Sequence, residues 1–370
     1  MKKTFFCLMA ITYCFASDSN YLPFPACPPP ETRWRTSFQL LVSQAKMNSL
    51  EYVLNNRADN SDVNGHLESL DFNFKFGGKL ELGYLFSHDL WDLKLAGSFL
   101  YSKAQDRASQ PVTSQTAVED PFISQGLVPI WFHPSAYLNS AYNNIRFANA
   151  RAAWKLDFYD AEMDLGRLFK VGEKIELRPA FGLKSIFTYQ KLSVELSNGR
   201  SFFYDSNLLI PTLLTPADSS LHLHNNAIGL GPKVALGAKW FLHPNFKLIF
   251  DAAGALLFTH FTTSRRETAD YTLTSNEIST EYGENFNGRA AFNGSKPYVG
   301  LNLGLGWEKC FARAGSSPVK CALDCSYLLE NFWKINQLIK FIDDYADGTY
   351  LSDNTDLQIQ SIVFAFSFSF

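Results

Sequence analysis

Charged residues are scarce in this sequence: Lys, Arg, Asp and Glu make up 19% of it, whereas about 25% is usual in a soluble protein. The formal net charge is only -3, so the chain lacks the basic surface that a nucleic-acid partner requires. After residue 16, no uncharged apolar run approaches the ~18 residues of a membrane helix. Aromatic residues, in contrast, reach 15%, with 33 Phe. The chain is therefore either a secreted or periplasmic protein or a membrane β-barrel. Besides a helix, only a closed barrel satisfies every backbone polar group inside lipid.

The N-terminus has the features of a secretory signal. Lysines at positions 2 and 3 precede an apolar stretch over 4–13, and small residues lead to Ala16, after which we expect cleavage. The sequence thus predicts three parts: a signal peptide (1–16), a Pro-rich periplasmic tail (17–33) and a transmembrane β-barrel (34–370).

The final residues alternate strictly between large apolar and smaller side chains. Ile362 and the phenylalanines that follow it share one face, while the other face is mostly serine and alanine. Such alternation predicts a strand with one strongly apolar side. The row also resembles the C-terminal signal read by the outer-membrane barrel assembly machinery, carried here by Phe364, Phe366, Phe368 and Phe370.

Deletion of Phe370 is therefore expected to reduce the amount of barrel assembled. Quantitative surface labelling of cells that express the shortened chain would measure this, and normal surface levels would refute it.

Period two recurs along the whole chain. The predicted strands are 34–46, 67–87, 91–103, 146–169, 175–191, 226–242, 246–263, 297–312, 319–332 and 357–370. The connections between them alternate long and short, as in outer-membrane barrels, which have short periplasmic turns and long outer loops. We therefore expect an all-β fold: a transmembrane antiparallel up-and-down barrel of about 10 strands in the bacterial outer membrane. A hairpin hidden in the 104–145 loop would raise the number to 12, but Pro129 and Pro134 favour a loop.

The apolar faces are expected to meet lipid, and the polar faces to line the lumen. Trp154, Leu156 and Phe158 are assigned to a lipid-facing side, which requires a β-bulge near Tyr159. The residues then predicted to face inward are Arg35, Lys75, Lys79, Glu81, Lys94, Arg151, Lys155, Asp157, Glu176, Arg178, Lys184, Lys233, Lys239, Asp251, Asp324 and Glu330. Basic residues outnumber acidic ones in this set, which indicates either a lumen with mild anion preference or paired charges that fill a narrow barrel.

No constellation of residues predicts catalysis, a metal or a cofactor. His222 and His224 form an H-x-H pair in an expected outer loop, but no nearby acidic or cysteine cluster completes a zinc site. His260 and Asp251 are nine residues apart on one strand, about 30 Å by rise, too far to form a catalytic dyad.

Four cysteines follow the expected cleavage site, in a compartment that permits disulfides. Cys321 and Cys325 are about 13 Å apart by strand rise, too far to bond. Cys310 and Cys321 flank a short turn and could bridge, although the alternation puts them on opposite faces. Cys27 could bond to the barrel rim, cross-link to another envelope protein, or remain a thiol.

Several motifs occur in an order that resembles the Legionella-type major outer membrane protein family, pore-forming barrels also found in chlamydia-related bacteria. The motifs are LELGYLFSHDLWDL (80–93), WKLDF (154–158), DLGR (164–167), LRPAFGLK (177–184), YQK (189–191), GLGPK (229–233), LGWE (305–308) and NQL (336–338). The resemblance extends from about residue 34 to the end and implies a porin-like channel for small hydrophilic solutes or ions. A non-conducting surface barrel, acting through its outer loops as a structural protein or adhesin, is the alternative. Outer membrane lipid and the assembly machinery are the expected partners.

Overall fold

The computed structural model describes residues 34–370 except 58–63, 87–89, 113, 116–121, 124, 133–144, 206–209, 244, 276–277, 312–318 and 342–349. Ten long strands dominate it: β1 (Trp34–Met47), β4 (Lys75–Leu85), β5 (Trp91–Ser109), β9 (Arg146–Arg167), β11 (Ile175–Asp205), β12 (Ile210–His243), β13 (Phe246–Ser275), β14 (Ile278–Phe311), β15 (Val319–Phe341) and β16 (Tyr350–Ser369). The short strands are β2 (Val53–Asn56), β3 (Gly65–Glu68), β6 (Ser114–Gln115), β7 (Phe122–Ile123), β8 (Gly126–Pro129) and β10 (Phe169–Val171). In the described residues, no helix is long and apolar enough to cross a membrane.

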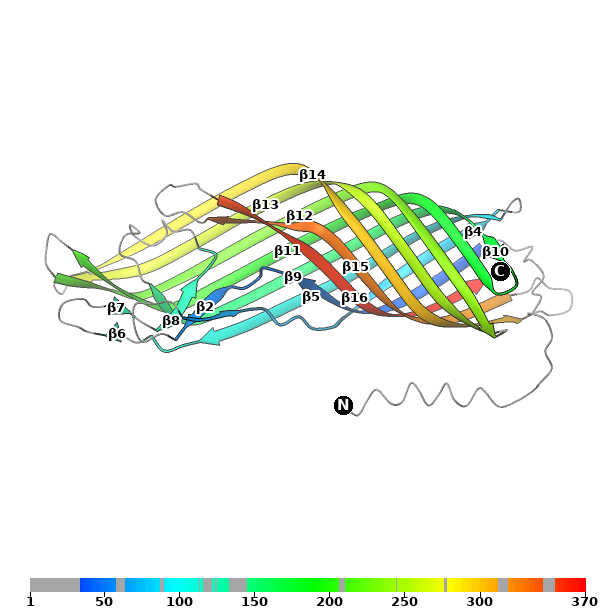
Figure 1. Cartoon of the computed structure of the whole chain (residues 1–370). Helices are drawn as coiled ribbons and strands as arrows, with labels where there is room; N and C mark the ends of the chain where they lie inside the picture. The colour runs from blue at the N-terminus through cyan, green and yellow to red at the C-terminus, as the bar shows by residue number, and fades with distance from the viewer. Residues whose placement is uncertain are drawn as a thin grey trace, which may run out of the picture.

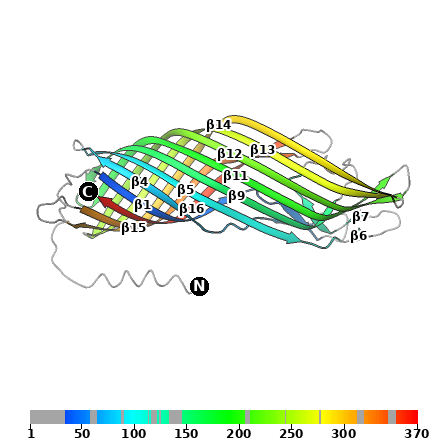
Figure 2. The same cartoon turned by 180° about the vertical axis from the view of Figure 1, so that it is seen from behind.

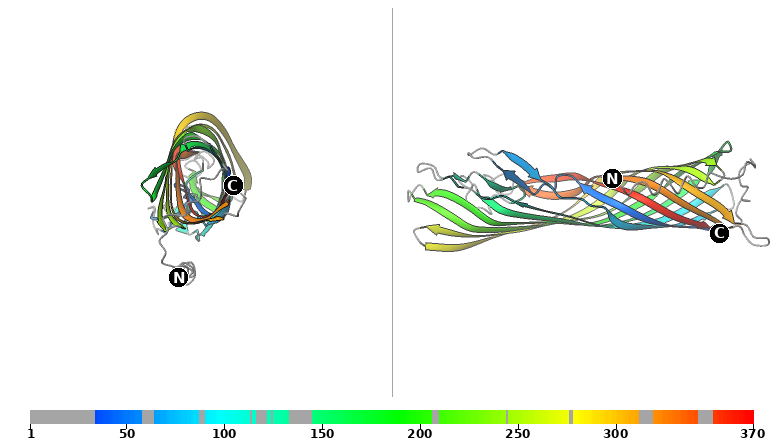
Figure 3. Two further views of the ribbon diagram at one scale, coloured as in Figure 1. Left: turned by 90° about the vertical axis from the view of Figure 1, so that its right-hand side faces the viewer. Right: turned by 90° about the horizontal axis from the view of Figure 1, so that it is seen from below.

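The ten long strands form a closed ring. Neighbours in the sequence pair antiparallel, and β1 pairs with both β4 and β16, so no edge remains. Figure 3 shows this ring along its axis, and Figure 1 shows the strands crossing the long barrel at a tilt. The short turns and the C-terminus lie at one end, and the short strands β2, β6, β7 and β8 at the other. These are called the turn end and the loop end below.

Each predicted strand overlaps one strand of this ring, but the boundaries differ. The strand expected over 67–87 begins only at Lys75, since 69–74 form no strand. Strands β11 to β14 continue far into the expected loops, because a backbone ladder needs no apolar face to persist. The 104–145 segment contributes β8, which pairs mainly with β2, and the small antiparallel pair β6–β7. None of these strands joins the ring.

The outward face near the turn end is an apolar band. Phe38, Phe76, Phe181 and Val234 are among its large side chains, each more than half exposed on the isolated chain. The predicted row on the final strand lies here as well: Ile362, Phe364, Phe366, Phe368 and Phe370 all point outward. A continuous apolar belt around a closed ring is what lipid contact requires.

The polarity of the wall reverses along each long strand. On β12 the outward residues are apolar from Ile228 to Leu242, but polar from Asp218 to Asn226. The inward residues do the opposite, with Lys233 and Lys239 near the turn end and buried Leu221 and Leu223 near the loop end. The barrel therefore passes from a membrane segment with a polar interior to a water-exposed extension with an apolar core.

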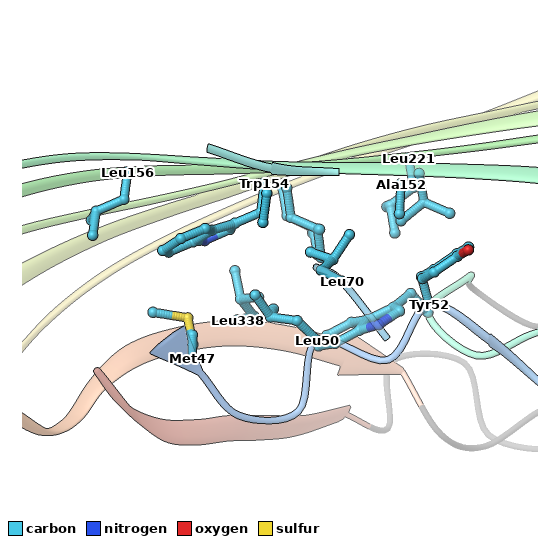
Figure 4. Close-up of a cluster of buried hydrophobic side chains, with 14 of the residues drawn as sticks. Met47, Leu50, Tyr52, Leu70, Ala152, Trp154, Leu156, Leu221 and Leu338 are labelled. Carbon is cyan, nitrogen blue, oxygen red and sulfur yellow. The ribbon is translucent and has the colours of Figure 1, made fainter. Parts of the chain in front are cut away.

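That apolar core includes a plug formed by the two first outer segments. Residues 48–57, 64–74 and 125–132, here called the plug, supply the buried Leu50, Tyr52, Leu70, Leu127 and Trp131. Figure 4 shows several of these side chains facing Trp154, Leu156 and Leu221 of the wall. Leu70 lies within the strand predicted over 67–87 but belongs to this buried cluster. The plug fills the barrel at its loop end.

Candidate functional site: the lumen

A cavity of about 1010 Å³, with many charged residues in its lining, occupies the turn-end half of the barrel. Its wall extends from the turn residues Leu168 and Glu173 to the buried Tyr298. Ten of the predicted inward residues line it: Arg35, Lys79, Glu81, Lys94, Glu176, Arg178, Lys233, Lys239, Asp251 and Glu330. Lys75, Lys184 and Asp324 also lie on inward positions of their strands, outside this lining.

Three predicted inward residues, Arg151, Lys155 and Asp157, are placed on the opposite face. All three are exposed on the outside of β9, while Ala152, Trp154 and Leu156, which alternate with them, are buried inside. The expected bulge near Tyr159 is absent, because β9 pairs without a register shift with both neighbours through this region. Trp154, Leu156 and Phe158 are therefore core residues of the extension, and the prediction that they meet lipid is wrong.

The same unbroken register of β9 points three acidic residues inward that the sequence analysis did not assign to the lumen. On β9, Asp160, Glu162 and Asp164 are inward and buried or nearly so. Asp92, Glu308, Lys247 and Lys320 also belong to the inner network and were missed. With these additions, and with Arg151, Lys155 and Asp157 outside, acidic residues balance the basic ones in the inner set, and the expected basic excess is absent. The sequence does contain a signal for the three acids of β9. The alternate residues from Trp154 to Asp164 share one face of a single strand without a bulge, so Asp160, Glu162 and Asp164 lie on the same face as Trp154.

The centre of the network is Lys184 on β11, whose side chain is 0% exposed. Its Nζ lies 2.6 Å from Asp160 and 2.5 Å from Glu162, and 4.3 Å from the centre of the Tyr298 ring. The Tyr298 hydroxyl donates to Glu330 at 2.9 Å. Four strands thus converge on one ammonium group, since a buried cation must be paired to remain charged.

Further ion pairs surround this centre. Lys233 contacts Glu162 at 2.9 Å and Asp164 at 2.8 Å, and Lys79 reaches Glu162 at 3.4 Å. This group, named here the central cluster (Lys79, Asp160, Glu162, Asp164, Lys184, Lys233, Tyr298 and Glu330), lies across the barrel between the cavity and the apolar core. Phe158 and Phe332 pack directly beyond it, at 5.3 Å between ring centroids. Lys184 also lies 5.8 Å from the Phe332 ring.

Polar contacts hold the plug against the wall. Arg265 of β13 donates to the carbonyl of Trp131 and to that of Ile339, and it pairs with Glu267 at 2.7 Å. The Tyr52 hydroxyl donates to Asp106 at 2.8 Å. Burial, together with the Asp106 carboxylate, raises the pKa of Tyr52 well above its usual value, so this donor keeps its proton. The plug is consequently docked by specific hydrogen bonds as well as by apolar packing.

The histidines lie outside this interior. His222 and His224 are on the outer face of β12 near the loop end, and His222 Nδ1 is 3.0 Å from Ser193 Oγ. No group of three or more metal-ligating side chains occurs among the described residues. His260 faces outward and Asp251 inward, so they are separated by the wall as well as by distance.

Cys310 is disulfide-bonded, and its partner lies outside the described part of the chain. Cys321 is a free thiol, so the Cys310–Cys321 bridge considered above does not form. The backbone gives the reason: in the β14–β15 ladder Cys310 is opposite Lys320, and Cys321 is opposite Lys309. Cys325 lies on the outward face. Cys27 lies outside the described residues, so the three alternatives given for it, a bond to the barrel rim, a cross-link to another envelope protein and a thiol, stay predictions.

A closed antiparallel ring with an apolar outer belt and a charged interior defines an integral β-barrel of the bacterial outer membrane. The profile of the Legionella pneumophila major outer membrane protein precursor matches residues 26–370, nearly the whole chain. The chain belongs to that family, as the motifs in the sequence predicted, and its place is the bacterial outer membrane.

No curated protein matches the chain. Among solved structures it is similar to the outer membrane protease OmpT of Escherichia coli, at 9% identity and a TM-score of 0.39, covering 95% of this chain and 100% of that one. A FadL homologue of Pseudomonas aeruginosa shows 10% identity and a TM-score of 0.28, with 92% and 90% covered. The toluene transporter TodX of Pseudomonas putida shows 9% and 0.25, with 94% and 92% covered. Likenesses this distant carry no argument about activity.

Proposed function

We propose that this protein is a narrow channel for small hydrophilic solutes or ions, closed at its loop end in the conformation described here. The observation that carries the proposal is the charged cavity of about 1010 Å³ inside the membrane segment. A barrel that only anchors an outer domain could fill this space with side chains, because about eight strands already suffice for that. Ten strands leave a small lumen, and a low conductance is expected.

The selectivity of this lumen is expected to depend on two cations. Arg35 and Lys239 line the cavity, and neither forms an ion pair with any residue that the structure describes. β1 and β12 are five places apart in the ring of ten, so these two side chains extend from opposite walls. Each of these cations favours anions in transit, whereas Glu176, opposite Lys239 in the β11–β12 ladder, and Asp251 line the same cavity without an ion pair to the described residues and favour cations.

Planar-bilayer recording of the refolded protein tests both statements. We expect small, brief conductance steps, which correspond to transient undocking of the plug, and Lys239→Glu is expected to shift the reversal potential in a salt gradient toward cation preference. Lys174→Glu is the matched control, because Lys174 is exposed in the turn after β10 and should leave the reversal potential unchanged. A lack of steps in every variant would contradict the channel proposal.

The plug favours a second candidate, a non-conducting surface barrel that displays its extension to the outside. Trp131, Tyr52 and Leu127 are 1% exposed or less, so the loop end is densely filled. The same recordings separate the two candidates, because a barrel that never conducts would show no steps even when the plug is weakened.

A further inference from the structure

Five cations form a patch on the outside of the barrel extension: Lys103, Arg107, Arg151, Lys155 and Lys191, here called the outer basic patch. They come from β5, β9 and β11, which lie side by side in Figure 2. All five side chains are exposed, and none forms an ion pair with the described residues. Two of them, Arg151 and Lys155, are the residues that the sequence had placed in the lumen.

The register brings the lysines into one row. Lys155 is the direct cross-strand partner of Lys103 on one side and of Lys191 on the other. Four residues farther along the strands, Arg151 is the direct partner of Arg107. Like charges directly opposite each other destabilise a sheet, so a wall that keeps two such pairs side by side calls for an anion between them.

Acidic neighbours do not neutralise the patch. Asp157 and Glu195 share this outward face. Asp157 lies two residues from Lys155 on the side of the apolar band, and Glu195 is the cross-strand partner of Arg151. Neither is within ion-pair distance of a patch residue in the described structure. Five positive and two negative side chains leave an excess of positive charge on the surface of β5, β9 and β11.

The position of the outer basic patch along the barrel axis, relative to the apolar band, indicates which ligand it meets. Tyr101 and Tyr159 mark the upper limit of the apolar band, with their hydroxyls 2.7 Å apart, and Tyr189 lies at the same level on β11. Tyrosines of this kind sit at the headgroup level of a membrane. The lysine row is two residues beyond Tyr101, about 7 Å by strand rise, on the side of the long loops. This is the level of the lipid phosphates in the outer leaflet.

We propose that the outer basic patch binds the phosphate groups of lipopolysaccharide, the phosphorylated glycolipid of the outer leaflet. Lysine and arginine together suit this ligand, since both donate charge-assisted hydrogen bonds to phosphate oxygens. Such a contact would restrict rotation of the barrel about its axis in the membrane. It would also make the face formed by β5, β9 and β11 the side on which lipopolysaccharide stays bound. The inference does not depend on whether the lumen conducts.

The test is a binding titration of the full refolded protein in neutral detergent. The probe is bisphosphorylated lipid A, compared with the same lipid after removal of both phosphates, and native mass spectrometry counts bound lipid. Lys155→Gln/Lys191→Gln is expected to weaken binding of the phosphorylated lipid at least about tenfold, as expected for the loss of one or more charge-assisted hydrogen bonds. Lys174→Gln/Lys309→Gln, the matched control, removes two exposed lysines near the turn end and should bind as the unmodified protein does.

Equal binding of the two lipids by the unmodified protein would overturn the proposal. So would undiminished binding in Lys155→Gln/Lys191→Gln, or displacement of the lipid by an equal charge of soluble polyanion. If the double variant fails to fold, as judged by its mobility on an unheated gel, the comparison of the two lipids on the unmodified protein decides the matter. The single variant Lys155→Gln then provides the second measurement.

Discussion

Lys184→Met is expected to destabilise the barrel by about 3–5 kcal/mol, the usual result of removing one partner from a buried ion pair. Lys184 is 0% exposed and holds Asp160 and Glu162 at 2.6 and 2.5 Å. Without it, Asp160 keeps only the hydroxyl of Ser98 as a described side-chain hydrogen-bond partner. The variant is measured by urea titration of the protein folded in lipid vesicles, followed by tryptophan fluorescence.

A control on the same strand separates charge burial from loss of a lysine. Lys191→Met changes the same residue type on the outer face of β11, where the side chain is exposed, and surface substitutions usually stay within about 0.5 kcal/mol. Lys184→Met/Asp160→Asn should recover part of the loss, because the neutral amide no longer needs a cation. If Lys184→Met unfolds at the same urea concentration as Lys191→Met, the central cluster does not stabilise the barrel.

The final strand shows what alternation alone can predict. Its outward row from Ile362 to Phe370 lies where period two put it, because lipid outside and small polar residues inside give an unambiguous contrast. The ring order of the ten strands followed in the same way from the alternation of long and short connections. Both features are local in the sequence, since each depends on neighbouring residues.

β9 shows where this reasoning fails. Period two identifies two faces, but it cannot tell which environment each face meets. Trp154, Leu156 and Phe158 continue in phase with Asp160 and Glu162, so the inner face changes from charged to apolar without any change of direction. The assumption that apolar means lipid required a bulge and reversed Arg151, Lys155 and Asp157. An apolar face beyond the membrane becomes predictable only once the plug is known.

The plug itself is determined by contacts between distant segments. Trp131 donates its indole N–H to the carbonyl of Glu51 at 2.6 Å, and β2 pairs with β8, whose residues follow those of β2 by seventy positions or more. No period marks such segments, because they form short strands and turns. Their apolar residues were visible in the sequence as Val128, Ile130 and Trp131, but nothing in the sequence showed that they fold inward.

Undocking the plug is expected to raise the single-channel conductance several-fold. Tyr52→Ser/Leu127→Ser removes two side chains that are 0% exposed, and each loses about 1.5–3 kcal/mol of apolar burial. The first change also removes the hydrogen bond to Asp106. The ring should survive, because its ladders involve neither residue.

The matched control for this experiment is Leu67→Ser, which alters a leucine of the plug that is 54% exposed and should leave the conductance unchanged. Limited proteolysis of vesicle-embedded protein reports independently whether residues 48–57 have become accessible. Increased cleavage together with increased conductance means that the plug is the closure. Increased cleavage at unchanged conductance means that the lumen stays closed without the plug. The central cluster, with Phe158 and Phe332 packed on its loop-end side, would then be the closure. In that case the barrel would function through its extension rather than through its lumen.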